Sequence, residues 1–517
     1  MIHFHKKLTI VRWHFIFTFR LFVLFLTGCA AVGPNYVPPE KTTPEKFNAA
    51  LSEDQKAKLS LPETEQKAEE TKTELTRQVT RAMLADWWNT LEDPLLTRLV
   101  RWAIRGNLDL QLAQSRLREE RALRGVARSG LFPTIEGDAA FTRRKTNLQS
   151  GGGGEIDLYS SGFDASWEID MFGGIRRSIE SAEASVEARE EELNATLVTL
   201  VSGVAINYIE IRAFQARLEA AVNNLESQES TLQIVQDRLD AGLTTTLSLE
   251  QAKYNLENSK SEIPILQTGI EQGKNGLAVL LGEFPGSLAE ELEQYQKVPT
   301  VSIEVAVGVP ADLLRRRPDV RRAERELAAQ TARVGVATAD LYPRLFLFGS
   351  VGLEYISAAS FFTGPAAAFQ IGPQIRWPVF NAGRIRQNIK IEDERQNQAL
   401  IQYEASVLTA VKDVENALVD FANEQVRRQA LLKSTQSAKS AVSLSRELYT
   451  AGLTDFIGVL DAERALFSFR DQLAASEGKV ISNLIRLYKS LGGGWKPLME
   501  DAPQAVPEQK QTQFEER

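Results

Sequence analysis

The sequence predicts a helical protein that also carries membrane β-strands, built from one structural unit that occurs twice. Three observations predict this fold class. A long proline-free segment has apolar residues at every seventh position, which indicates a coiled-coil helix. Segments in both halves alternate apolar and polar residues, as strands with one polar face do. Many residues also recur 210 positions later without a gap, which indicates a tandem duplication.

The first 28 residues have the pattern of an export signal. Lys6 and Lys7 precede an apolar and aromatic stretch that ends just before the only cysteine, Cys29. The preceding Leu-Thr-Gly resembles a bacterial lipobox. We therefore expect residues 1–28 to be a signal peptide, and Cys29 to be lipidated as the first residue of the mature chain. The alternative is a signal-anchor helix with a chance Gly-Cys, and Arg20 inside the apolar run departs from the usual signal pattern.

Residues 29–85 are expected to form a lipidated tether and a periplasmic segment. The tether contains Pro34, Pro38, Pro39 and Pro44, which favour an extended chain. Residues 52–80 are rich in Glu, Lys, Gln and Thr, so we expect a solvated helix or disorder there. No stretch after the leader has 18 consecutive apolar residues, so no later helix is expected to cross a bilayer.

The first repeat is assigned to residues 86–300. A helix is expected at about 107–130, followed by strands at about 134–146 and 156–170, and then by a long helical hairpin over 174–282. The first arm of the hairpin, about 65 residues, would be roughly 100 Å long at 1.5 Å per residue. It is expected to end at Gly242-Leu243-Thr244, where Gly242 can adopt the left-handed conformation that stops a helix.

The second repeat is assigned to residues 301–496 and has the same order of elements. Strands are expected at about 344–356 and 366–379, and a helical hairpin over 384–492 that turns at Gly452-Leu453-Thr454. Other residues conserved between the repeats are Asp109 and Asp319, Leu131 and Leu341, Trp167 and Trp377, Gly173 and Gly383, and Leu281 and Leu491. Residues 497–517 are polar and are expected to be a disordered tail.

The four predicted strands favour a membrane barrel with a wet lumen. Between 163 and 169, for example, apolar and aromatic residues alternate with charged and polar ones. A small soluble sheet with one solvated face is the alternative. The export signal and the lack of a helical layer to cover an apolar face favour the barrel. Because about eight strands are needed for closure, the barrel must be shared between chains.

The composition excludes several kinds of function. The formal net charge is −8, or −12 without the leader, which argues against a nucleic-acid partner. The three histidines are His3, His5 and His14, all in the leader. Serine–histidine and cysteine–histidine catalysis and zinc sites built from His or Cys are therefore excluded in a processed chain. We expect no enzymatic activity, no metal site and no cofactor.

Several motifs together resemble the outer membrane efflux proteins, the TolC-like exit ducts, and within them the lipoprotein branch that works with resistance-nodulation-division pumps. The motifs are Gly28-Cys29, Gly33-Pro34-Asn35-Tyr36, Trp87-Trp88, Asp93-Pro94-Leu95, Asn107-Leu108-Asp109-Leu110 and Gly308-Val309-Pro310-Ala311-Asp312-Leu313-Leu314-Arg315-Arg316-Arg317-Pro318-Asp319-Val320. The resemblance implies a homotrimer in the outer membrane, a shared 12-stranded barrel with four strands from each chain, and a long periplasmic helical barrel. It also implies two protein partners, a periplasmic adaptor and an inner-membrane resistance-nodulation-division transporter. The arginine cluster at 315–317 is expected to pair with acids of neighbouring helices.

The resemblance further implies a periplasmic gate just after the second turn. Matched by the Leu-Asp-Ala pattern, the gate residues are Ile457, Asp461 and Arg464. Under threefold symmetry Asp461 would form a ring of three like charges, which favours cations and resists closure unless it is compensated. The alternative is that Asp461 and Arg464 form an ordinary exposed i, i+3 pair. The adaptor is expected to contact the two turns, Gly242-Leu243-Thr244 and Gly452-Leu453-Thr454.

The sequence therefore favours a passive exit duct for small toxic compounds or drugs, supplied by an energised pump. An outer-membrane duct for protein secretion is a related alternative. A structural lipoprotein that only bridges the envelope belongs to a different class. It would not need strands with an apolar outer face.

Overall fold

A computed structural model describes residues 31–39, 86–146, 154–299, 316–362 and 366–494 of the 517-residue chain. The predicted lipidation site Cys29, most of the segment before Trp87, the motif at 308–314 and the predicted tail at 497–517 lie outside these residues. The described elements, in order, are η1 (Trp87–Leu91), α4 (Pro94–Gly106), α5 (Leu108–Ser129), β1 (Thr134–Thr146), β2 (Gly154–Ile169), α6 (Gly174–Asp240), α7 (Thr246–Leu281), α8 (Pro318–Ala339), β3 (Arg344–Tyr355), η4 (Ala358–Ser360), β4 (Ala367–Arg376), α9 (Arg384–Thr450) and α10 (Phe456–Ser490).

The chain forms two compact units, and each unit takes segments from both repeats. The first unit comprises Met1–Glu40, Ser115–Glu190 and Arg321–Ala405, and it contains the strands. The second comprises Lys41–Gln114, Glu191–Val320 and Ser406–Arg517, and it contains both helical turns. The boundaries of the two repeats, 86–300 and 301–496, stay a prediction, because packing joins the repeats within each unit.

The long helices α6 and α9 each have 67 residues and end in the same way. Gly242 has φ +69° and Gly452 has φ +75°. Leu243 N–H donates to the Arg238 carbonyl at 2.8 Å, and Leu453 N–H donates to Leu448 at the same distance. This six-to-one bond beside a left-handed glycine is a Schellman motif, which satisfies carbonyls that the helix end leaves unpaired.

One part of α6 bears on the expectation that no helix after the leader crosses a bilayer. An 18-residue window of this helix is apolar enough to cross a bilayer by composition, although we expected none after the leader. Most of the window is buried inside the molecule. Val204 and Ile211, two members of the heptad series, are fully buried there. The window is therefore part of a buried core helix. Such helices also pass a test of length and hydropathy for membrane spans.

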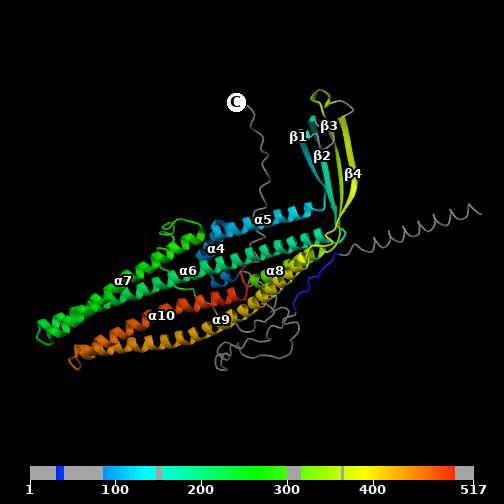
Figure 1. Ribbon diagram of the computed structural model, residues 1–517. Coiled ribbons are helices and arrows are strands. Elements are labelled where there is room, and N and C mark those ends of the chain that lie inside the picture. Colours follow the sequence, from blue (N-terminus) through cyan, green and yellow to red (C-terminus); the bar gives the residue numbers. More distant parts are fainter. Residues whose placement is uncertain (1–30, 40–85, 147–153, 300–315, 363–365, 495–517) are drawn as a thin grey trace, which may run out of the picture. The chain divides into compact units, whose positions relative to one another are not determined.

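The first unit contains one antiparallel sheet with strand order β1-β2-β3-β4, and Figure 1 shows the four strands side by side. The cross-strand register places Phe163 opposite both Gly137 and Val351, and Val351 opposite Phe369. These residues share one face. With the exception of Ile156, the exposed large apolar residues of the strands all lie on that face: Ile135, Phe141, Phe163, Trp167, Leu347, Val351, Phe369, Ile371 and Ile375.

The opposite face of the sheet carries most of the acids and amides of the strands, although Leu158, Phe346 and Phe348 also lie on it. It carries Glu136, Asp138, Asp164 and Glu168 from the first repeat, and Gln370 and Gln374 from the second. In the described chain β1 pairs only with β2, and β4 only with β3, so the sheet has two open edges. The strand predicted at 366–379 is shorter in the structure and ends at Arg376, which pairs with Arg344, the first residue of β3.

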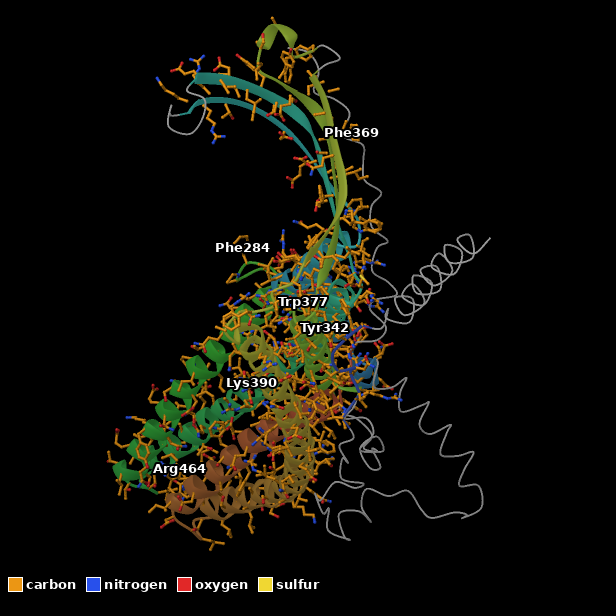
Figure 2. The ribbon with its side chains drawn as sticks, turned by 45° about the vertical axis from the view of Figure 1, so that its right-hand side comes forward. Phe284, Tyr342, Phe369, Trp377, Lys390 and Arg464 are labelled. Atoms are coloured by element: carbon orange, nitrogen blue, oxygen red, sulfur yellow. The ribbon has the colours of Figure 1, made fainter. Side chains whose placement is uncertain are left out.

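Two equivalent tryptophans join the strands to the helices at the base of the sheet. Trp167 Nε1 donates to the Leu131 carbonyl at 2.9 Å, and Trp377 Nε1 donates to the Leu341 carbonyl at 3.0 Å. Figure 2 shows Trp377 at this base and Phe369 further out on the strand. The duplication thus conserves a hydrogen bond as well as a residue.

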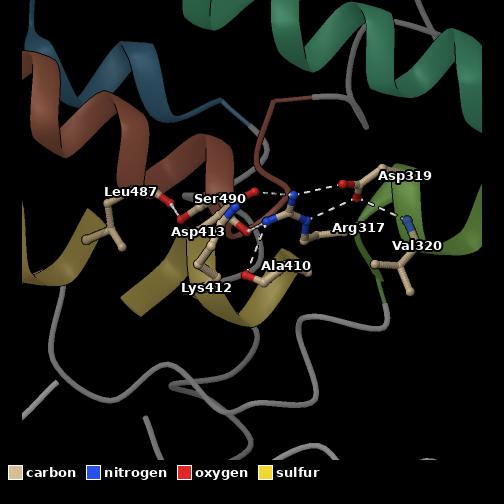
Figure 3. A network of polar contacts seen from close by, with 8 residues as sticks. All are labelled: Arg317, Asp319, Val320, Ala410, Lys412, Asp413, Leu487 and Ser490. Atoms are coloured by element: carbon tan, nitrogen blue, oxygen red, sulfur yellow. Dashed lines mark hydrogen bonds and ion pairs between the residues drawn. The ribbon is translucent and has the colours of Figure 1, made fainter. Parts of the chain in front are cut away.

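In the second unit, the start of the first short helix of each repeat meets the end of its last helix through a polar side chain. Asn107 Nδ2 donates to the Leu280 carbonyl at 3.0 Å, and Arg317 Nη1, at the equivalent position, donates to the Ser490 carbonyl at 2.9 Å. Arg317 is also paired with Asp319 and Asp413, which confirms the prediction for this member of the cluster, whereas Arg315 lies outside the described residues (Figure 3). These bonds cap helix carbonyls that would otherwise be buried without a donor.

Candidate gate at the helical turns

The turns of the two helical hairpins lie in the second unit and contact each other. Tyr449 and Thr244 share a hydrogen bond of 3.3 Å between their hydroxyl oxygens. Arg238 donates to the Thr450 carbonyl at 2.9 Å, and its guanidinium lies 4.8 Å from the centre of the Tyr449 ring. A cation at the last carbonyls of α9 also interacts favourably with the dipole of that helix.

An apolar cluster lies beneath the turns and joins both hairpins. Its buried members are Val235, Leu249, Ala252, Tyr449, Phe456, Val459 and Leu460. In contrast, the tips of the turns are open to solvent. Leu243 is 64% exposed and Leu453 is 75% exposed, while Thr244 and Thr454 are half-buried. The two Gly-Leu-Thr turns thus present apolar tips next to a buried apolar cluster.

Above this cluster, Arg446 forms the centre of a buried polar network that joins three helices. It donates to Glu463 on α10 through Nη2 at 2.6 Å and Nε at 3.0 Å. It also donates to Ser227 Oγ at 2.7 Å and Thr231 Oγ1 at 2.8 Å, both on α6. Thr231 in turn donates to Glu463 at 2.7 Å. Glu463 is only 4% exposed, so the ion pair lies largely out of water.

The three predicted gate residues lie on the first turns of α10 and differ in their contacts. Ile457 is 49% exposed, and Asp461 is exposed and makes no hydrogen bond or ion pair within the described chain. Arg464 turns away from Asp461 towards α7. It donates from Nε to Asn255 at 3.0 Å and from Nη2 to the Tyr254 hydroxyl at 2.9 Å. The surface pair between Asp461 and Arg464, which was the alternative interpretation, does not form.

Arg464 and Tyr254 occupy equivalent positions in the two repeats, 210 residues apart. The Arg464 guanidinium also lies 5.4 Å from the centre of the Tyr254 ring. Arg464 thus binds Tyr254 in two ways, through a cation–π contact with the ring and a hydrogen bond to the hydroxyl. Both contacts link the second hairpin to the first. The duplication therefore has different residues at one position, and these two residues bind each other.

Sequence reasoning missed Arg446, Glu463 and Thr231. A signal was present, because Glu463 follows Val459 by four residues and precedes Leu466 by three, and therefore lies on the apolar face of α10. An acid on such a face requires a buried partner. The donors to Glu463 are Arg446 on α9 and Thr231 on α6. Because they lie on two other helices, spacing along α10 could not identify them. Among the described residues, no group of three or more acids, histidines or cysteines is placed to hold a metal ion.

Comparisons with known proteins agree with this architecture. The family model of the outer membrane efflux proteins matches residues 99–283 and 309–493, two segments that are themselves offset by 210 residues. The solvent efflux pump outer membrane protein SrpC of Pseudomonas putida is 32% identical over 412 residues, which cover 78% of this chain and 86% of SrpC. The probable outer membrane lipoprotein SilC of Salmonella typhimurium is 28% identical over 475 residues, or 92% of this chain and 97% of SilC.

Among solved structures, the outer-membrane channel OprN superimposes with a TM-score of 0.81 at 34% identity, covering 90% of this chain and all of the OprN chain. The residues matched by the family model include both helical hairpins and all four strands. The chain belongs to the outer membrane efflux protein family.

Proposed function

We propose that this protein is the passive exit duct of a tripartite efflux pump, and that three copies assemble to make it. The observation that carries the proposal is the sheet with two open edges and one apolar face. An open edge is a site for pairing with another strand, and an apolar face needs lipid or protein to cover it. Three copies would supply 12 strands, an even number within the range of membrane barrels, with the polar face lining a wet lumen.

The partners follow from this arrangement and from the family. A passive duct would receive its substrate from an energised transporter in the inner membrane. A periplasmic adaptor would bind the exposed tips at Leu243 and Leu453 and connect the two membranes. The names of the relatives, which include solvent efflux and a probable outer membrane lipoprotein, support small toxic compounds as the cargo and a lipid anchor at Cys29. We propose no catalytic role.

The gate is proposed to close at the turns. Asp461 is exposed and unpaired within the described chain, so threefold symmetry would place three carboxylates where they repel one another. Arg446 and Arg464 would offset this repulsion by binding the second hairpin to the first. Opening would then require these contacts between hairpins to break.

Single-channel conductance of the purified trimer in planar bilayers tests this function. A low conductance in the wild type that changes its cation preference in Asp461→Ala is the expected result, because the substitution removes the charged ring. Glu250→Ala, which removes an exposed acid of α7 whose i, i+3 pair with Lys253 is also exposed, is the matched control. A stable trimer without conductance in every variant would favour a structural lipoprotein. A conductance with the same ion selectivity in Asp461→Ala would keep the duct and remove the gate.

A further inference from the structure

Residues 31–36, which we call the strap, cross the first unit and contact helices from both repeats. Val32 N–H donates to the Phe172 carbonyl at 3.0 Å, beside the end of β2. Further along, the Tyr36 hydroxyl donates to Glu324 on α8 at 3.1 Å, and the Arg325 guanidinium lies 5.5 Å from the centre of the Tyr36 ring. The strap is therefore fixed at both of its ends.

Arg177, on the first turn of α6, binds the middle of the strap. Its Nε donates to the Val32 carbonyl at 3.1 Å, and its Nη2 donates to the Gly33 carbonyl at 3.3 Å and to Asn35 Oδ1 at 2.7 Å. Its third nitrogen, Nη1, donates to Glu180 at 2.7 Å. The side chain is nearly buried, with 4% of the residue exposed. A planar guanidinium with several fixed donors is suited to this task, whereas a lysine has one nitrogen.

Close backbone contacts show that the strap fits a groove with little free space. Gly33 has φ +89°, and a Cβ at this position would lie 2.5 Å from the Cα of Gly335 on α8. A Cβ on Gly173 would lie 2.5 Å from the Cα of Ala31. Any side chain at position 33 would therefore be strained by its backbone conformation and would also clash with α8.

We propose that Arg177 is a positioning residue that clamps the strap, and that the clamp fixes the membrane anchor at the foot of the sheet. The part that concerns the anchor rests on the proposed lipidation of Cys29. Only Ala30 lies between Cys29 and Ala31, so the two Cα atoms are two steps apart along the chain, a reach of at most about 7 Å. Because Ala31 lies against Gly173 where β2 meets α6, the acyl chains would enter the bilayer beside the base of the strands. A clamp of this kind sets the depth of the strands relative to the leaflet that holds the anchor.

Distance measurements between two spin labels test the clamp without depending on the lipid. The labels replace Val37, which is 76% exposed, and Glu183, which is exposed on α6. A Cys29→Ser background keeps them the only two cysteines. In this parent protein we expect a narrow distribution of distances between the two labels. In Arg177→Ala the distribution should become broad. Arg177→Lys should broaden it in part, because one ammonium group cannot reach all of the strap acceptors.

Two further variants separate a broken clamp from a misfolded protein. Gly33→Ala alters only the strap and should also broaden the distance. Arg121→Ala removes an arginine whose ion pair with Glu190 is exposed, and it should leave the distance narrow. A distance that stays narrow in both Arg177→Ala and Gly33→Ala would overturn the clamp. If mass spectrometry of the wild type shows no acyl group on Cys29, the role in anchoring fails while the clamp itself stands.

Discussion

Removal of the Arg446 side chain should loosen the contact between the two hairpins. The substitution Arg446→Ala removes both bonds to Glu463. Within the described chain it leaves a carboxylate that is 4% exposed with only the Thr231 hydroxyl as a donor. Breaking one side of a buried ion pair costs about 3–5 kcal/mol. The Arg446 side chain is 30% exposed, so water can replace part of its contribution, and we take the lower end of that range. A loss of about 3 kcal/mol corresponds to a roughly 150-fold larger population of the opened hairpin.

Hydrogen exchange of the purified trimer measures this population directly. The first two turns of α10, from Phe456 to Glu463, should exchange faster in Arg446→Ala by about that factor. Arg395→Ala is the control on the same helix α9, since the Arg395 side chain is 58% exposed and its i, i+3 partner Glu392 keeps a second donor, Gln330 Nε2, at 2.6 Å. The double variant Arg446→Met, Glu463→Met should recover most of the protection, because no unpaired charge remains. Exchange in Arg446→Ala within a few-fold of the wild type would refute this reasoning.

Two other predictions concern the rest of the second unit. Arg317→Ala should lower the free energy of unfolding by about 2 kcal/mol, because buried carbonyls lose their donor, whereas Arg316→Ala at the exposed neighbouring position should have almost no effect; thermal denaturation compares the two. Burial alone would raise the pKa of Glu424, but hydrogen bonds from Ser476 and Arg427 lower it below its ordinary value of 4.5. Since the folded pKa lies below the unfolded one, this contribution is complete above about pH 4.5 and is lost as the pH falls through the folded pKa. The difference in melting temperature between the wild type and Glu424→Gln should therefore shrink on acidification, and a difference that does not change with pH would contradict it.

The repeat is the part of the fold that the sequence predicts most completely. Its period of 210 residues places Trp167 and Trp377 at equivalent positions, and both make the same bond to a carbonyl. Gly242 and Gly452 were expected to stop their helices, and both have positive φ. These features depend on local geometry, which a few neighbouring residues determine. The sheet register also follows from alternation, since a shift of one residue would exchange its apolar and polar faces.

The contacts at the gate and at the strap could not be predicted in the same way. Spacing on α10 suggested that Arg464 would face Asp461, but its partners are Asn255 and Tyr254 on α7. An arginine side chain has several rotatable bonds, and the choice between a solvated partner and a partly buried aromatic one depends on which helix packs beside it. Similarly, no local signal assigns Arg177 to the strap, which lies 142 residues away from it at Asn35.

The sequence by itself therefore determined the duplication, the long helices with their turns, the four strands and the family. Each of these is encoded by periodicity, by glycine at a required backbone conformation, or by motifs within one stretch of chain. The tertiary structure alone decided which charged groups meet, from Arg446 with Glu463 to Arg177 with the strap. The physical reason is that desolvation determines the energy of a charge, and only the packing of distant helices decides which groups leave water together.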